Sequence, residues 1–249
     1  MRAILTYHSI DESGSPISVG REAFRAHARW LASGTVRVLP LAELMAAPDD
    51  TDAVSITFDD GFVNFAEEAA PLLQQGSLPS TVFVVPEHVG GTNDWEGHAV
   101  PGIPSLPLMS WKTLGSLAGS GVTLGAHTRR HRDLTRVTGA ALEDEVAGCV
   151  ERMAAELGQR PATFAYPYGA VDATAATVAR DVFAYACTTE FRVLRRDEDR
   201  ALLPRLDMFY FRDPGQLEAW GSPAFRRRLW LRAQGRRVRR LVRRQGRAA

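Results

Sequence analysis

The sequence has little cysteine and no long apolar run, and each shortage excludes a class of protein. Only two of the 249 residues are cysteines, Cys149 and Cys187, and their separation matches no metal-binding or redox motif, which favours two reduced core residues. No apolar run approaches the roughly eighteen residues that a membrane-spanning helix needs. No secretory signal follows Met1, so the sequence predicts a cytoplasmic protein if Met1 is the native start.

Acidic residues are missing from the end of the chain, although the net charge is only +1. Residues 226–249 contain eleven arginines and no acidic residue, whereas residues 1–225 contain 19 basic and 29 acidic residues. The sequence therefore predicts an acidic domain over 1–225 and a basic, arginine-rich tail over 226–249. The hydrophobic fraction of 45% is ordinary for a globular protein and excludes a disordered or collagen-like chain.

The tail interleaves arginine with leucine, tryptophan and valine, so a helix there could separate an apolar side from an arginine side. Such a helix could lie on an anionic membrane surface, dock on the acidic domain of its own chain, or bind an acidic partner. The alternative is a disordered, solvated tail. No nucleic-acid recognition motif accompanies the charge, and we expect no nucleic-acid partner.

Short apolar segments alternate with segments of helical periodicity over most of the chain. The predicted strands cover residues 3–7, 53–58, 80–85, 122–126, 163–165 and 185–189, and the predicted helices cover residues 21–33, 41–47, 62–75, 111–120, 141–157 and 172–180. This alternation predicts an α/β fold with a mainly parallel sheet, either a barrel or an open sheet. Residues 86–110 form a long stretch rich in glycine and proline, which is typical of a functional loop.

Polar residues follow several of these strands, and the carboxyl ends of parallel strands are where sites form. Asp59 and Asp60 follow the strand at 53–58, and two adjacent carboxylates need a cation, hydrogen bonds or a raised pKa on one of them. The alternative is that they cap the next helix. His127 and His131 follow another strand, and a helical turn there would aim both imidazoles the same way.

Two histidines and one carboxylate would make an open metal site, with room for water and substrate. The alternative is a pair of surface or capping histidines. The segment Tyr166-Pro167-Tyr168-Gly169 ends a third strand in a rigid turn that a ligand could approach closely. Its alternative is a simple turn between strand and helix with packed aromatic rings.

Three strings together resemble the motifs of the polysaccharide deacetylases (the NodB-homology domain, carbohydrate esterase family 4). They are Thr-Phe-Asp-Asp-Gly at 57–61, His-Thr-Arg-Arg-His at 127–131 and Tyr-Pro-Tyr-Gly at 166–169, in the family's order, within a resemblance covering about residues 1–210. The resemblance implies a distorted (β/α) barrel of about seven parallel strands. It also implies metal-dependent removal of N-acetyl groups from a glycan that contains N-acetylhexosamine, either a polysaccharide or a lipid-linked precursor.

The resemblance also assigns roles to residues. Asp60, His127 and His131 would hold a divalent metal, with zinc the default and cobalt or nickel also suited to such ligands. Asp59 would be the general base that deprotonates the metal-bound water, and the backbone N–H of Tyr168 could hold the oxyanion.

The sequence departs from the family pattern in two places. No histidine follows His131, so the family's usual late acid is missing. His8 ends the first strand, as in the poly-N-acetylglucosamine deacetylase subgroup, which this chain most resembles, and we expect it to be the general acid. The alternative is a histidine that caps a strand or binds substrate. Ala165 stands where the third motif often begins with arginine, and Arg205 could hold the catalytic carboxylate instead, or form only a structural ion pair.

Trp95, in the long loop, could stack on a sugar ring in the substrate groove; the alternative is a packed loop anchor. The sequence thus predicts a metal-dependent carbohydrate N-deacetylase. Two other functions stay open: a deacylase of another small amide, and a catalytically inactive carbohydrate-binding relative. A lipid-linked precursor at the inner face of the membrane would suit both the predicted cytoplasmic location and the basic tail.

Overall fold

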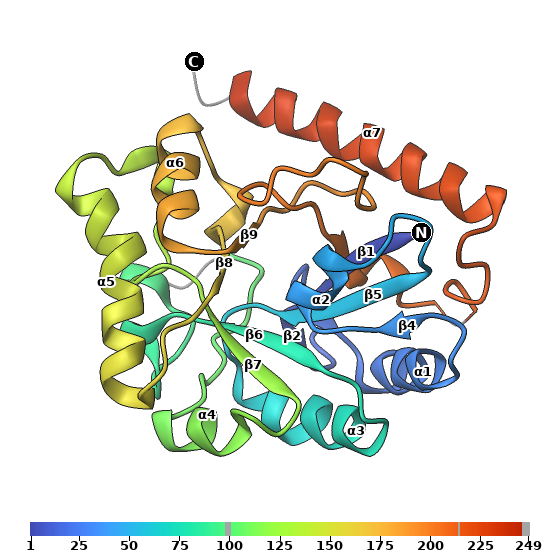
Figure 1. Ribbon diagram of the computed structural model, residues 1–249, viewed down its shortest axis with the longest axis horizontal. Coiled ribbons are helices and arrows are strands. Elements are labelled where there is room, and N and C mark those ends of the chain that lie inside the picture. The colour runs from blue at the N-terminus through green and yellow to red at the C-terminus, as the bar shows by residue number, and fades with distance from the viewer. Residues whose placement is uncertain (98–100, 214, 246–249) are drawn as a thin grey trace.

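Parallel strands form a curled sheet at the centre of the structure (Figure 1). The computed structural model describes residues 1–97, 101–213 and 215–245. Across the sheet the strands follow the order β10 (Leu206–Asp207), β1 (Arg2–Tyr7), β5 (Ala53–Phe58), β6 (Ser80–Val84), β7 (Val122–Ala126), β8 (Thr163–Ala165) and β9 (Tyr185–Cys187). A further short strand, β4 (Arg37–Val38), pairs with β5. The paired strands run parallel, and most are short apolar runs, as expected for a sheet that helices cover.

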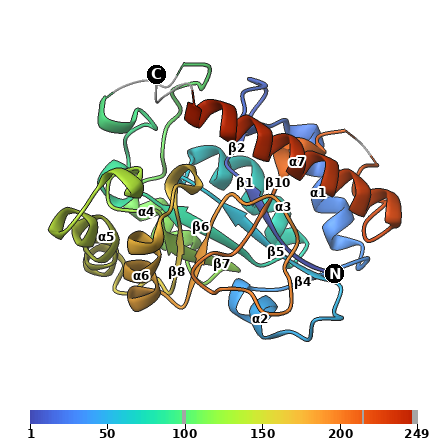
Figure 2. The same cartoon turned by 90° about the horizontal axis from the view of Figure 1, so that it is seen from above.

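Helices cover the outside of the sheet (Figures 1 and 2). They are α1 (Arg21–Ala32), α2 (Leu41–Ala46), α3 (Ala70–Gln75), α4 (Trp111–Leu117), α5 (Ala140–Leu157), α6 (Ala173–Val182) and α7 (Pro223–Gln245). Their ends follow from local chemistry: Asp172 caps α6 by accepting a hydrogen bond from the Ala175 N–H, and α5 ends at Gly158, which adopts the left-handed conformation.

The segment after β9 joins the two edges of the sheet. Leu203 forms a parallel bridge with Cys187 of β9, and three residues later Leu206 pairs with Leu5 of β1. The last strand therefore lies beside the first, and Arg205 lies between these two pairings. This arrangement confirms the predicted distorted (β/α) barrel of about seven parallel strands.

The structure differs from the predicted elements mainly where elements are short or turns are tight. The helix predicted over 62–75 is helical over 63–75 but irregular, since a π-helical turn, Phe65–Ala69, precedes α3. The two-residue strands β4 and β10, and the separate pair β2 (Ser9–Ile10) and β3 (Ser18–Val19), were not predicted. Two residues carry no periodicity that a sequence pattern could reveal.

The arginine-rich end of the chain is helical as far as it is described. Helix α7 begins at Pro223, three residues before the predicted start of the tail, and its side chains Phe225 and Leu229 are buried against the body. The described portion of the chain contains no helix with the length and apolar character needed to cross a membrane.

Candidate metal site and its surroundings

The predicted site residues converge at the carboxyl ends of the strands. His8 follows β1, Asp59 and Asp60 follow β5, and His127 follows β7. Neither aspartate caps a helix, because the helical residues begin at Val63, three positions after Asp60, and no side chain caps the turn Phe65–Ala69. The cap alternative is therefore excluded for both carboxylates.

Asp60, His127 and His131 form a buried cluster whose candidate ligand atoms all lie within 4.8 Å of one another. The Oδ1 atom of Asp60 lies 3.4 Å from Nε2 of His127 and 3.3 Å from Nε2 of His131. This oxygen is buried and has no hydrogen-bond partner among the described residues. Burial alone would raise the pKa of Asp60, but the two imidazoles that face it lower that pKa.

The outer nitrogens of both imidazoles are engaged elsewhere. Nδ1 of His127 lies 2.7 Å from the carbonyl oxygen of Ala165, and since a carbonyl only accepts, this nitrogen carries the hydrogen. In neutral His127 the lone pair of Nε2 then points towards Asp60, and lone pair and carboxylate repel. Nδ1 of His131 lies 3.1 Å from the hydroxyl oxygen of Tyr168. The donor set therefore fits a cation held between the three side chains.

The pKa values of the two histidines are shifted in opposite directions. It lowers the pKa of His131 to about 4. Burial alone would also lower the pKa of His127, yet Asp60 and Asp59 raise it above its usual value. The neutral imidazole that a metal requires is therefore more readily available at His131 than at His127.

The segment that carries both histidines is not helical, which corrects the predicted helical turn. Thr128 and His131 adopt positive φ angles of 59° and 61°, and this left-handed path brings the imidazoles together. Glu145 of α5 holds the segment: its backbone carbonyl accepts from the Arg129 N–H at 2.9 Å, and its Oε2 accepts from the Arg130 N–H at 2.9 Å.

Sequence reasoning missed Glu145, although a signal was present. Glu145 is only 1% exposed and shares the buried face of α5 with Leu142, Val146 and Cys149. An acidic residue in an apolar helical stripe needs a buried partner, and here the partner is the histidine-bearing segment.

Asp59 is held by Arg205, and both side chains are almost fully buried. Nη1 of Arg205 donates to Oδ1 at 2.6 Å and Nη2 donates to Oδ2 at 2.7 Å, a two-pronged contact. The Nε of Arg205 donates to the Thr188 carbonyl at 3.0 Å, which fixes the guanidinium plane. Burial alone would raise the pKa of Asp59, but Arg205, then His8 and His127, hold it below its usual value.

His8 lies at the opening of this group. Its Nε2 is 3.6 Å from Oδ2 of Asp59, and its side chain is 23% exposed, whereas Asp59 is buried. A group in this position contacts both the carboxylate and the solvent side of the site.

Trp95 and Tyr168 both pack on His131. The Trp95 ring stacks on the imidazole with centroids 4.0 Å apart, and Trp95 is buried. Tyr168 has a φ of 60°, touches the same imidazole edge-on, and leaves 57% of its surface exposed. Tyr168 is thus placed to meet a ligand with its ring, whereas Trp95 mainly supports a candidate metal ligand.

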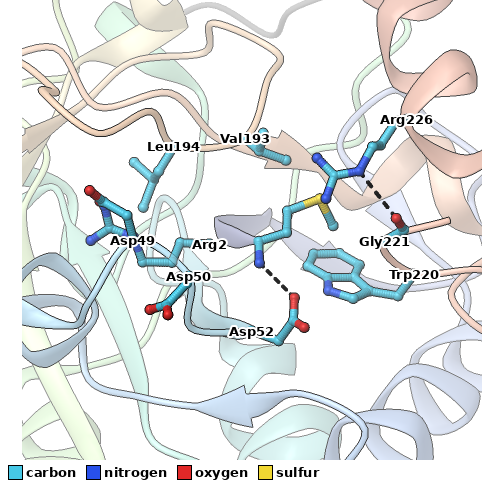
Figure 3. A pocket seen from close by; sticks show the side chains of 10 residues that line it. Arg2, Asp49, Asp50, Asp52, Val193, Leu194, Trp220, Gly221 and Arg226 are labelled. Carbon is cyan, nitrogen blue, oxygen red and sulfur yellow. Dashed lines mark hydrogen bonds and ion pairs between the residues drawn. The ribbon is translucent and has the colours of Figure 1, made fainter. Parts of the chain in front are cut away.

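A cleft of about 580 Å³ lies at the opposite end of the sheet (Figure 3). Its lining includes Arg2 at the start of β1, Asp52 just before β5, and Arg226 of α7. None of the predicted site residues lines it. The cleft therefore marks the amino ends of the strands, away from the Asp-His-His cluster.

An open Asp-His-His cluster at the carboxyl ends of a curled parallel sheet defines a class, the (β/α) barrels that can hold a catalytic metal. The profile of the family "Polysaccharide deacetylase" matches residues 46–185, which is more than half of the chain. This protein belongs to the polysaccharide deacetylase family.

Curated relatives and solved structures agree with this assignment. The Bacillus subtilis protein YxkH is 25% identical over 209 residues, covering 82% of this chain and 70% of the relative. The poly-beta-1,6-N-acetyl-D-glucosamine N-deacetylase of Staphylococcus epidermidis is 22% identical over 203 residues, covering 76% of this chain and 67% of the relative.

Two crystal structures share the fold. IcaB from Ammonifex degensii superposes with a TM-score of 0.69 at 24% identity, covering 82% of this chain and 90% of IcaB. A polysaccharide deacetylase from Bacillus cereus also gives a TM-score of 0.69, at 22% identity over 83% of this chain, which spans only 64% of that structure.

Proposed function

We propose that the protein is a metal-dependent carbohydrate N-deacetylase, which hydrolyses the acetamido group of an N-acetylhexosamine in a glycan to an amine and acetate. The observation that carries the proposal is the buried Asp60–His127–His131 cluster, with its unpartnered carboxylate oxygen, in a chain of the polysaccharide deacetylase family. The name of the Staphylococcus epidermidis relative supports N-acetylglucosamine as the sugar.

Asp60, His127 and His131 would hold the cation, and zinc is the default for two imidazoles and one carboxylate, with cobalt or nickel also suited. When bound, such a cation lowers the pKa of water and polarises the acyl carbonyl. Ala165 and Tyr168 would fix the orientation of the two imidazoles through their Nδ1 atoms.

Asp59 would accept the proton of the attacking water, acting as the general base. Arg205 would hold the carboxylate plane in place and keep it ionised, so Arg205 is a positioning residue. A general base of this kind contributes about 10²–10⁴-fold to the rate.

His8 would donate a proton to the leaving amine. Its partial exposure and its distance of 3.6 Å from Asp59 support this role, because an acid must lie near both the base and the leaving group. The backbone N–H of Tyr168 would stabilise the oxyanion, and the exposed ring of Tyr168 would contact the sugar. Trp95 would border the substrate groove beside His131.

The test is acetate release from N-acetylglucosamine oligosaccharides, with a panel of other N-acylated sugars and small non-sugar amides. We expect Asp59→Asn and His8→Ala each to reduce the rate by about 10²-fold or more, while Asp181→Asn, an exposed aspartate on α6, serves as the matched control. Activity that survived both substitutions would refute the assignment of base and acid.

The same panel separates the competing functions. Hydrolysis of only the non-sugar amides would replace the proposal with a small-amide deacylase. Binding of the oligosaccharides without release of any acid, in metal-loaded protein, would replace it with an inactive carbohydrate-binding relative.

The predicted location at the inner face of a membrane, acting on a lipid-linked precursor, is also part of the proposal. It is supported by the basic character of α7. Cell fractionation tests it, and recovery of the protein outside the cell would overturn it.

A further inference from the structure

Helix α7 uses one of its sides to attach to the body. Phe225 and Leu229 are buried, and the guanidinium of Arg232 lies 4.5 Å from the centre of the Tyr210 ring. Arg236 forms an ion pair of 3.3 Å with Asp207 and donates to the Thr189 carbonyl at 3.2 Å. Part of the arginine charge of α7 is thus used within the molecule.

The opposite side of α7 carries two large apolar side chains that are open to solvent. Trp230 is 60% exposed and Leu231 is 53% exposed, and both neighbours Arg226 and Arg227 are exposed as well. These four side chains, two apolar and two basic, form an exposed side of α7 that we call the outer stripe.

The direction of α7 relates the outer stripe to the catalytic end. Arg226 lines the cleft at the amino ends of the strands, and ten residues later Arg236 contacts Asp207 at the end of β10. Figure 2 shows α7 running across the barrel, over β10. The helix continues to Gln245, about 14 Å further at 1.5 Å per residue. Thr189, which Arg236 contacts, lies against the backbone of Tyr168 at the site. The helix therefore runs along the barrel towards the Asp-His-His cluster.

We propose that the outer stripe of α7 docks on an anionic lipid bilayer. Tryptophan and leucine favour the boundary between headgroups and acyl chains, and bordering arginines are attracted to anionic headgroups. The body, at about −10, is repelled by the same headgroups, so the attraction must come through α7 and turns that side of the molecule to the lipid. A polyanion such as nucleic acid would need the arginines but would gain little from exposed Trp230 and Leu231.

This docking would lay α7, whose Arg236 contacts Thr189 beside Tyr168, along the lipid surface. On the proposed function, to which this one step is tied, a substrate borne on lipid would meet the site without leaving the membrane. The docking itself is independent of catalysis.

Co-sedimentation of the full chain with lipid vesicles tests the proposal. We expect strong binding to vesicles of equal parts phosphatidylcholine and phosphatidylglycerol, weak binding to phosphatidylcholine alone, and release at about 1 M salt, where the Debye length falls to about 3 Å. The double variant Trp230→Ser/Leu231→Ser should reduce the partition coefficient about tenfold or more, because it removes the two apolar side chains that would enter the bilayer.

The charge of α7 is tested with a matched pair of double variants. Arg226→Gln/Arg227→Gln should weaken binding about fivefold for each arginine, whereas Arg29→Gln/Arg136→Gln changes the net charge equally at exposed positions elsewhere and should leave binding within twofold. Equal losses in the two double variants would overturn the proposal, because net charge alone would then explain binding.

Three other results would also overturn the proposal. These are equal affinity for the two kinds of vesicle, unchanged binding by Trp230→Ser/Leu231→Ser, and tighter binding to a DNA duplex that the same double variant leaves unaltered. Acetate release from a soluble oligosaccharide should be unchanged in Trp230→Ser/Leu231→Ser. If no variant or wild-type protein released acetate while vesicle binding followed the pattern above, the proposed function would fail and the docking would stand.

Discussion

The two ends of the parallel sheet contain the same kinds of charged residue in different states of pairing. At the amino end, Arg2 donates to the carbonyls of Leu44 and Ala47 and pairs with Asp49, which also meets Arg196. At the carboxyl end, the buried Oδ1 of Asp60 has no hydrogen-bond partner among the described residues. Burial and charge occur at both ends, so the distinguishing mark of the candidate site is convergence of acceptors that the protein itself does not satisfy.

The adjacent aspartates repeat this contrast within the site. Both carboxylate oxygens of Asp59 accept hydrogen bonds from Arg205, whereas Asp60 faces two imidazole nitrogens. One carboxylate is satisfied by the protein and the other is left for a cation. This division matches the two roles proposed for them, a base and a ligand.

The largest expected effect is the loss of stability when the buried ion pair of Arg205 and Asp59 is broken. Arg205→Met should destabilise the protein by about 3–5 kcal/mol, because it leaves Asp59 buried without its partner. Arg2→Met should cost only about 1–3 kcal/mol, since Asp49 is 41% exposed and keeps Arg196. Urea unfolding at neutral pH measures both, and equal losses would show that the two ends do not differ in this way.

The next largest effect should be on zinc affinity, which we expect to differ between substitutions at the two ends of the sheet. Asp60→Asn should weaken zinc binding by more than about 100-fold, because a metal ligand itself is lost. Loss of a residue that only hydrogen-bonds to a ligand costs up to about 100-fold. Asp49→Asn, at the amino end, should leave zinc affinity unchanged. Competition with a chromogenic chelator measures the dissociation constants, and an Asp60→Asn protein that binds zinc as the wild type does would contradict the cluster as a metal site.

Glu145 provides a subtler test of the carboxyl end. Glu145→Ala should weaken zinc binding by about 10–100-fold, because the segment carrying both histidines loses a buried anchor. Glu145→Gln keeps an acceptor for the Arg130 N–H and should restore part of the affinity. Asp144→Asn is the matched control, since the hydrogen bonds that Asp144 accepts within the described part of the chain come from arginine side chains of the same segment.

Melting temperatures of the metal-free proteins complete this test. If Glu145→Ala lowered the melting temperature but left zinc affinity unchanged, Glu145 would support the fold without positioning the ligands.

The smallest expected effect is a change in the free energy of unfolding with pH in the metal-free protein. His131 has a folded pKa of about 4 against about 6.5 when unfolded, so between these values the unfolded chain binds a proton that the folded protein does not. Stability should therefore fall as the pH drops from about 6.5 towards 4, by at most about 3 kcal/mol from this group. The raised pKa of His127 acts in a different range: above pH 6.5 the folded protein binds a proton that the unfolded chain does not, so there stability should rise as the pH falls towards 6.5.

Urea unfolding across this pH range, in wild type and His131→Asn, measures that slope. The variant should lose less stability on acidification than the wild type. Parallel pH profiles would contradict the assignment of the low pKa to His131.

The sequence predicted the continuous elements and the polar residues at their ends. The strand at 53–58 and the strand at 122–126 were predicted to the residue, because each is a compact apolar run. The left-handed conformations of Thr128 and His131 were invisible, since neither residue type requires them. The sequence identified Trp95 as an aromatic residue of the long loop, but its packing against His131 depends on how that loop folds.

Contacts between distant segments were the least predictable. The sequence offered Arg205 as a partner of the catalytic carboxylate, but not its place between the pairings to β9 and β1, because the two-residue strand β10 leaves no periodic signal. Glu145 acts through backbone groups of another segment, and sequence reasoning that looks for matching side chains does not find such contacts.

The closure of the barrel by residues 203–207 has a consequence for synthesis of the chain. Asp59 and Arg205 are 146 residues apart, so a ribosome adding 5–20 residues per second makes the arginine roughly 7–30 s after the aspartate. During that interval the strands already made lack β10 and the guanidinium that neutralises Asp59. The nascent barrel must therefore keep this carboxylate hydrated, and the site is completed only when the last strand arrives.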